Sequence, residues 1–226
     1  MTMPASASPD VQIRFVVPTS FHDIPVLGTE EQVAERLWEL ACEVLASDPD
    51  EVRARWAALL ARMIPSMAEA GVIYAGLCLV DVGGRPSTAS VVASLAPLGG
   101  IGSQNAVDTL LPAFARARPA ATVTAIELPA GRAAAVIDGV VTPTDGGTFA
   151  SSVIQVHLPL PNEFQLLSLE LSTPCAEDWE LYSEVFAGIV RSVHLEFADL
   201  PGAAPGPGAA PAPAPGVEAK VRAAFG

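Results

Sequence analysis

The sequence predicts an α+β domain, in which an antiparallel β-sheet of three hairpins packs against several α-helices. Three pairs of strand-like runs are each separated by a short turn signal, and amphipathic helical stripes lie before, between and after them. Half of the 226 residues are apolar and 16% are charged, which is sufficient to bury a core at this length. Strands in hairpins with helices covering a face of the sheet form a layered α+β architecture.

The strand-like runs are 72–82 with 87–95, 122–128 with 132–141, and 149–158 with 164–171. Gly83-Gly84 separates the first pair and Pro129-Ala130-Gly131 the second, and both are residue types that favour tight turns. The third pair is expected to turn at residues 159–163. A further strand is expected over residues 11–17, where Pro18 ends it.

Two helices are expected before the first hairpin. Thr29 and Gln32 form a capping-box pattern, and the apolar stripe that follows predicts a helix to about residue 46. Asp48 followed by Pro49 predicts a second helix start, with Asp48 as the cap. This second helix is expected to end at Gly71.

Two more helices are expected later in the chain. Asn105 and Asp108 indicate the start of a helix that ends near Arg118. Thr173-Pro174 predicts the cap of the last helix. Its apolar residues recur at the spacing of one helical face, as expected of a helix that packs on a sheet: Trp179, Tyr182, Phe186, Ile189 and Val193.

The composition divides the chain into a single globular domain, residues 1–200, and a C-terminal tail. Residues 201–216 contain proline, alanine and glycine alone, which predicts a flexible, disordered linker. Residues 217–226 follow, with Val217, Val221 and Phe225 at every fourth position. These three side chains would share one face of a short helix, so the segment is a candidate docking peptide. A frayed terminus with chance apolar residues is the alternative.

The formal charge of −13 disfavours nucleic acids and anionic membranes as partners, because phosphate groups repel an acidic surface. No apolar run reaches the roughly 18 residues that span a bilayer. The N-terminus lacks the basic and apolar regions of a secretory signal, so a cytoplasmic location is expected. The abundance of Ala, Pro, Gly and Arg, with Lys220 as the single lysine, suggests a GC-rich, actinobacterial genome.

No metal or cofactor is expected. The three cysteines, Cys42, Cys78 and Cys175, are far apart and have neither CxxC nor Cys/His spacing. Reduced, buried thiols are the simplest interpretation.

Ser168 and His157 are the catalytic candidates. In the simplest register of the third hairpin, Gln155 lies opposite Ser168 and His157 lies opposite Leu166, so His157 is a diagonal neighbour of Ser168. Glu170 lies too far along the ladder to orient the imidazole, so no third member completes a triad. The competing interpretation is a solvated outer face of the sheet.

A weaker candidate is an anion site at Gly100 and Gly102, in a glycine-rich stretch before the helix that Asn105 opens. Free backbone donors at a helix N-terminus attract anions. No lysine follows, as a P-loop would require, so a flexible connector is the favoured alternative.

Residues 153–193 resemble the end of the PsbP-like fold family, which includes LpqN-type actinobacterial lipoproteins. The likeness lies in VIQVHLPLP, a tight turn, LLSLELSTP and a helix reading WELYSEVFAGIVRSV. The chain differs from the lipoproteins in lacking a lipobox cysteine, and in having two long helices before its first hairpin. The resemblance implies a non-catalytic accessory protein that acts by binding others, and it transfers no site residue.

These observations together favour an accessory or adaptor protein that acts by protein–protein binding. Trp38, just off the apolar stripe of its helix, joins the tail residues as a partner-binding candidate, because interfaces are enriched in tryptophan. A small hydrolase or ligand-binding enzyme with an unrecognised cleft is one alternative, and a self-assembling structural protein is another. The sequence leaves the partner and the oligomeric state open.

Overall fold

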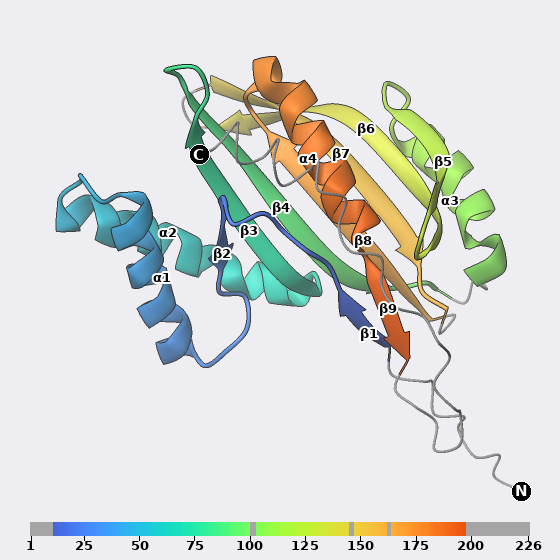
Figure 1. The fold of residues 1–226 in the computed structure, drawn as a ribbon, viewed down its shortest axis with the longest axis horizontal. Helices are drawn as coiled ribbons and strands as arrows, with labels where there is room; N and C mark the ends of the chain where they lie inside the picture. The colour runs from blue at the N-terminus through green and yellow to red at the C-terminus, as the bar shows by residue number, and fades with distance from the viewer. Residues whose placement is uncertain (1–10, 100–102, 145–146, 162–163, 198–226) are drawn as a thin grey trace, which may run out of the picture.

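The protein forms an antiparallel β-sheet with helices on both faces (Figure 1). The computed structural model describes residues 11–99, 103–144, 147–161 and 164–197. In these residues seven strands form one sheet in the order β2-β3-β4-β8-β7-β6-β5, and β1 pairs with β9 in a second, two-stranded sheet. The elements are β1 (Val11–Arg14), β2 (Phe21–Ile24), α1 (Glu30–Val44), α2 (Asp50–Glu69), β3 (Val72–Asp81), β4 (Pro86–Pro97), α3 (Ser103–Ala117), β5 (Thr122–Leu128), β6 (Gly131–Thr144), β7 (Gly147–Pro159), β8 (Gln165–Thr173), α4 (Trp179–Arg191) and β9 (His194–Phe197).

The predicted α+β class and its three hairpins are confirmed. β3 pairs with β4, β5 with β6, and β7 with β8, all antiparallel. Gly83 and Gly84 form the first turn with φ of 63° and 83°, a backbone region that glycine adopts without strain. The hairpins are joined through β4 with β8 and β6 with β7, so the third hairpin lies between the other two.

The first helix begins as predicted and the second does not. The Thr29 hydroxyl accepts the Gln32 N–H at 3.3 Å while the Gln32 side chain accepts the Thr29 N–H at 3.0 Å, which completes the capping box. For α2 the predicted Asp48 cap is wrong, because Pro49 is the N-cap and offers no side-chain acceptor. Instead, the Arg53 guanidinium donates to the carbonyls of Leu45 and Ala46 and so ties the start of α2 to the end of α1.

Other boundaries differ from the prediction where tertiary contacts decide them. The strand expected over residues 11–17 ends at Arg14, and the Val16 N–H donates to the Ser192 hydroxyl instead of a strand partner. α3 begins two residues before Asn105. The last helix begins at Trp179 and not at Thr173-Pro174, because the Thr173 hydroxyl accepts the Cys175 N–H in a turn and a 3₁₀ turn, Ala176–Asp178, follows.

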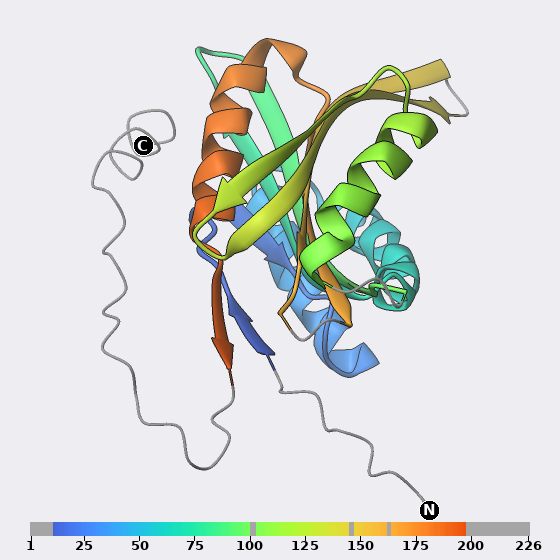
Figure 2. The same cartoon turned by 90° about the vertical axis from the view of Figure 1, so that its right-hand side faces the viewer.

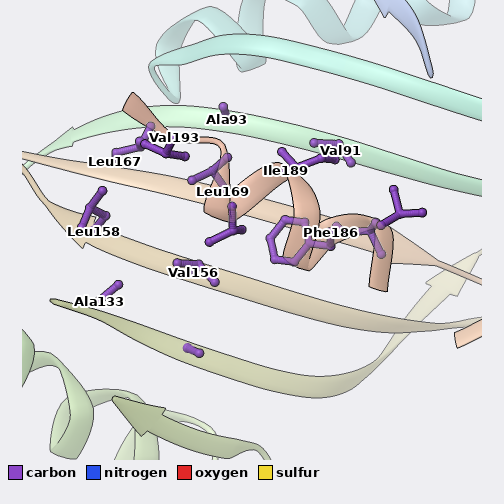
Figure 3. Close-up of a cluster of buried hydrophobic side chains, with 14 of the residues drawn as sticks. Val91, Ala93, Ala133, Val156, Leu158, Leu167, Leu169, Phe186, Ile189 and Val193 are labelled. Atoms are coloured by element: carbon purple, nitrogen blue, oxygen red, sulfur yellow. The ribbon is translucent and has the colours of Figure 1, made fainter. Parts of the chain in front are cut away.

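Helix α4 covers one face of the sheet and contributes the centre of the main core (Figure 3). Its predicted stripe is confirmed, because Tyr182, Phe186 and Ile189 are fully buried. The sheet contributes the inward-facing side chains of its central strands, which are Val91, Ala93, Val156, Leu158, Leu167, Leu169 and Leu171. Burial of this apolar surface is the main source of stability in a domain of this size.

The opposite face carries α1, α2 and α3 (Figure 2). Leu60 of α2 packs with Ala75 of β3, and α1 packs on α2 and β2. Helix α3 packs across β5, β6 and β7 at the other end of the sheet. Arg132 of β6 and Asp108 of α3 form an ion pair at 2.9 Å that joins these layers. The side chains of β7 and β8 that point away from α4 therefore lie on the face that α3 partly covers.

Candidate functional site

The predicted contact between His157 and Ser168 is present, and it is more direct than the sequence indicated. His157 lies directly opposite Ser168, and its Nδ1 is 2.8 Å from the Ser168 hydroxyl. The predicted register, with Leu166 opposite His157, is wrong by two residues. The strand continues through Pro159, which pairs with Leu166, and the Leu160 N–H donates to the Gln165 carbonyl at 2.9 Å. β7 therefore ends, and β8 begins, one residue later in the chain than expected.

The imidazole of His157 is buried, which contradicts the expectation of a solvated outer face. Only 9% of the residue is exposed, because the Phe114 ring of α3 stacks on it with a centroid separation of 4.5 Å. Its Nε2 is buried and has no hydrogen-bond partner. Burial, with a smaller contribution from the positive charge of Arg118, lowers the pKa of His157 to about 4. The imidazole is therefore neutral at pH 7.

A second polar chain lies beside this pair on the same face. Arg118, just after α3, donates to the Gln155 side-chain oxygen at 2.6 Å, and the Gln155 amide donates to the Glu170 carboxylate. Gln155 and Glu170 lie directly opposite one another on β7 and β8. Glu170 is thus held by Gln155 and not by His157.

This geometry does not form a catalytic triad among the described residues. A nucleophilic serine needs a base that a third group orients and that stabilises the charge it gains. Here the second nitrogen of His157 meets no acceptor, and its low pKa makes it a weak base at neutral pH. The arrangement instead forms a buried polar contact between His157 of β7 and Ser168 of β8, and Phe114 of α3 packs on it.

A buried polar cluster at the start of α4 was missed by the sequence analysis. Asp178 is buried, and Arg85 binds both of its carboxylate oxygens, at 3.1 and 2.9 Å. The Ser87 hydroxyl donates to the same carboxylate and lies 2.9 Å from the Tyr182 hydroxyl. Arg85 first, and then Ser87, hold the pKa of Asp178 below its usual value. These contacts fasten the start of α4 to the turn and first residues of the β3–β4 hairpin.

The exposed apolar side chains of α2 form the clearest candidate for a binding surface. Val52, Leu59 and Met63 are exposed, at 40%, 57% and 45%. They are separated by seven and four residues, so they lie on one face of the helix. We call them the α2 stripe. Trp38 of α1, predicted as a partner-binding residue, is 40% exposed.

A shallow, open hollow of about 370 Å³ lies where β6 passes the first turn of α4. Ile137, Ser152 and Trp179 contribute to its lining. Few groups line the hollow, and none of its polar side chains is buried without a hydrogen-bond partner. The lining therefore does not indicate a particular ligand.

The remaining predictions concern parts of the chain that the structure leaves undescribed. Gly100 and Gly102, proposed for anion binding, lie outside the described residues, as do the linker 201–216 and the segment 217–226 with Val217, Val221 and Phe225. Among the described residues, no group of three or more His, Cys, Asp and Glu side chains is placed to hold a metal ion. In that part of the chain, no helix has the length and apolar character needed to cross a membrane.

Comparison with known proteins identifies a structural likeness. Neither a protein-family model nor a curated protein sequence matches the chain. The solved structure of LpqN from Mycobacterium tuberculosis, described as involved in cell envelope biogenesis, matches with a TM-score of 0.43 and 11% sequence identity. The match covers 84% of this chain and 86% of LpqN. The solved structure found is thus that of an LpqN-type protein, the group that residues 153–193 resemble; at this TM-score and identity the likeness carries no information on function or site residues.

Proposed function

We propose that the protein is a non-catalytic accessory protein that binds another protein through the α2 stripe. The observation that carries the proposal is the exposure of Leu59 and Met63 on a helix face that adjoins the face packed against α1 and the sheet. Apolar side chains collected on one exposed helix face mark an interaction surface more often than single exposed residues do. Methionine adapts its shape to a partner and is enriched in interfaces.

The charges beside the stripe indicate the kind of partner. Arg55 and Arg62 are exposed and lie four residues before and three residues after Leu59, so they border the stripe along one side. Two arginines at an apolar stripe are notable in a chain of net charge −13. The partner that fits is an amphipathic helix whose apolar face is edged by aspartate or glutamate.

The first experiment compares what the full-length protein and its variants retain from native lysate. Leu59→Asp with Met63→Asp places two charges in the stripe, and we expect it to lose a partner that the wild type retains. Val16→Asp is the matched control, because Val16 is 68% exposed and lies near the other face of the sheet, beside the end of α4. Circular dichroism establishes that each variant is folded. A partner held equally by all three proteins would contradict the proposal.

A second pair of substitutions tests the charge of the partner. Arg55→Glu with Arg62→Glu should weaken binding by about tenfold or more and reduce its dependence on salt, because attraction to an acidic helix becomes repulsion. Binding that strengthens after the reversal would show a basic partner and refute the acidic helix.

The hydrolase alternative rests on the 2.8 Å contact between His157 and Ser168. A fluorophosphonate probe that labels Ser168 in the folded protein, and not in a His157→Gln variant, would favour that alternative. We expect no labelling, because His157 is buried under Phe114 and no carboxylate orients it.

A further inference from the structure

Helix α1 carries a line of accessible apolar side chains that is separate from the α2 stripe. Ala34 and Trp38 are exposed and Cys42 is half-buried, and they recur at every fourth residue along one side of the helix. We call these three residues the α1 line. Trp38 is 40% exposed, although tryptophan is on average a largely buried residue. Figure 1 shows α1 at the opposite end of the domain from α3, so neither α3 nor its contacts cover the line.

Acidic side chains edge the α1 line along its length. Glu31, Glu35 and Glu39 are exposed, and each lies three residues before a member of the line. Arg36, the arginine of α1, is two residues from Trp38 and therefore lies on another side of the helix. The α2 stripe is edged by arginines and the α1 line by glutamates, so the two surfaces fit partners of opposite charge.

Residues 217–226, outside the described residues, have a sequence pattern that matches this surface. Their apolar residues recur at every fourth position, as those of the α1 line do: Val217, Val221 and Phe225. In a helix, Lys220 and Arg222 would flank this apolar face on its two sides. Together with Glu218 they give the segment a net charge of +1, in a chain whose net charge is −13. The segment is thus the basic, apolar partner that a glutamate-edged surface favours.

The chain between β9 and the segment is long enough to bring the two surfaces together. Residues 198–216 separate the end of β9, at Phe197, from the segment. Extended at about 3.1 Å per residue, this stretch spans roughly 59 Å. A compact domain of about 200 residues has a radius of gyration of roughly 16 Å and a diameter of about 40 Å. The segment can therefore reach most of the domain surface, and tethering gives it an effective concentration in the millimolar range.

We propose that residues 217–226 dock as a short helix on the α1 line of the same chain. The apolar side chains of the segment pack along the line, and Lys220 and Arg222 meet its glutamates. One of these cations also stacks on the ring of Trp38, the aromatic face that best attracts a positive charge. Ten residues are too few to hold a helix alone in water, so packing on α1 supplies the missing stability. The α2 stripe does not serve as the seat, because Arg55 and Arg62 repel a basic segment.

The contact is independent of the proposed accessory function. It uses α1 and residues 217–226, whereas the accessory function uses the α2 stripe and a separate protein. Each can therefore fail without the other.

The test follows the indole N–H signal of Trp38 in the NMR spectrum of the ¹⁵N-labelled full-length protein, assigned with Trp38→Phe. Phe225→Asp removes an apolar anchor of the segment and should shift this signal, while the signals of Trp56 and Trp179 stay in place. Ala209→Asp is the matched control, because it adds the same charge to the linker, and it should shift none of the three. A Trp38 signal that Phe225→Asp leaves unmoved would overturn the proposal.

Charge reversal identifies α1 as the seat of the segment. In a Glu35→Lys, Glu39→Lys background the segment should be released, so adding Phe225→Asp should no longer shift the indole signal. Adding Lys220→Glu with Arg222→Glu to that background should restore the attraction, and with it the effect of Phe225→Asp. A merely structural role of the glutamates would not give this rescue. An effect of Phe225→Asp that persists in the reversed background, or no rescue, would refute docking on α1.

Dilution separates docking within one chain from exchange between two copies. A tethered contact does not depend on concentration, so the Trp38 signal should stay in place between about 500 and 20 µM. A signal that moves on dilution toward its position in Phe225→Asp would show that the segment of a second copy occupies the line, which would overturn the proposal.

Discussion

Acid should destabilise this protein between pH 6.5 and 4 because of one buried imidazole. The ordinary pKa of histidine, 6.5, applies to His157 in the unfolded chain, and burial lowers it to about 4 in the folded protein. Between these values the unfolded chain binds a proton that the folded protein excludes, so stability falls as pH falls. The contribution is fully present above pH 6.5 and fully lost below pH 4.

The size of the effect follows from the shift in the pKa of His157. Each unit is worth about 1.4 kcal/mol, so the shift to about 4 corresponds to roughly 3 kcal/mol in total. At pH 5 the loss relative to pH 7.5 is about 2 kcal/mol. The carboxyl of Asp178 does not interfere in this window, because its pKa lies below 3.8 in the folded protein and its contribution is lost at lower pH.

The assay is urea unfolding of wild type and His157→Gln at several pH values between 7.5 and 4.5. The variant lowers stability at pH 7.5 through lost packing, but its free energy of unfolding should fall by about 2 kcal/mol less than that of wild type between pH 7.5 and 5. Phe114→Ala, which uncovers the ring, should raise the pKa of His157 and flatten the profile in part. Equal losses in wild type and His157→Gln would refute the reasoning.

Three further predictions concern the fold. Gly71→Ala should destabilise the protein more than Gly83→Ala. Both glycines have positive φ, which costs an alanine about 1–2 kcal/mol. A Cβ at Gly71 would also clash with the Leu95 carbonyl oxygen, whereas a Cβ at Gly83 would meet open space. Equal losses in thermal unfolding would contradict this clash. Phe186→Ala should cost about 3–5 kcal/mol, measured by urea unfolding, because the side chain lies fully buried at the centre of the main core. Thr29→Ala should cost about 1 kcal/mol by the same measurement, through loss of the capping box.

Much of the secondary structure was predictable because it depends on local chemistry. The turn at Gly83-Gly84 requires positive φ, and the Thr29 capping box satisfies helix donors three residues away. The stripe of α4, from Trp179 to Val193, repeats at the helical period. Each of these signals lies within a few residues of the structure that it specifies.

The candidate sites were predictable only in part, because they depend on contacts between distant residues. Ser168 and His157 were found together, but their register depended on whether the strand continued past Leu158, as it does through Pro159. The bonds from Arg85 to Asp178 join positions 93 residues apart, and no local spacing connects them. The exposure of the α2 stripe likewise depends on which other face of the helix packs against α1 and the sheet.

The sequence by itself determined the α+β class, the three hairpins and the acidic character of the chain, because alternation, helical periodicity and turn chemistry are properties of neighbouring residues. Tertiary structure alone decided the order of the hairpins, the burial of His157 under α3 and the extension of β6 beyond its pairing with β5. The physical reason is that pairing and burial between distant segments are settled by competition among all possible partners. The residues of a hairpin specify its own turn, but they do not specify which other strand will pair with its edge.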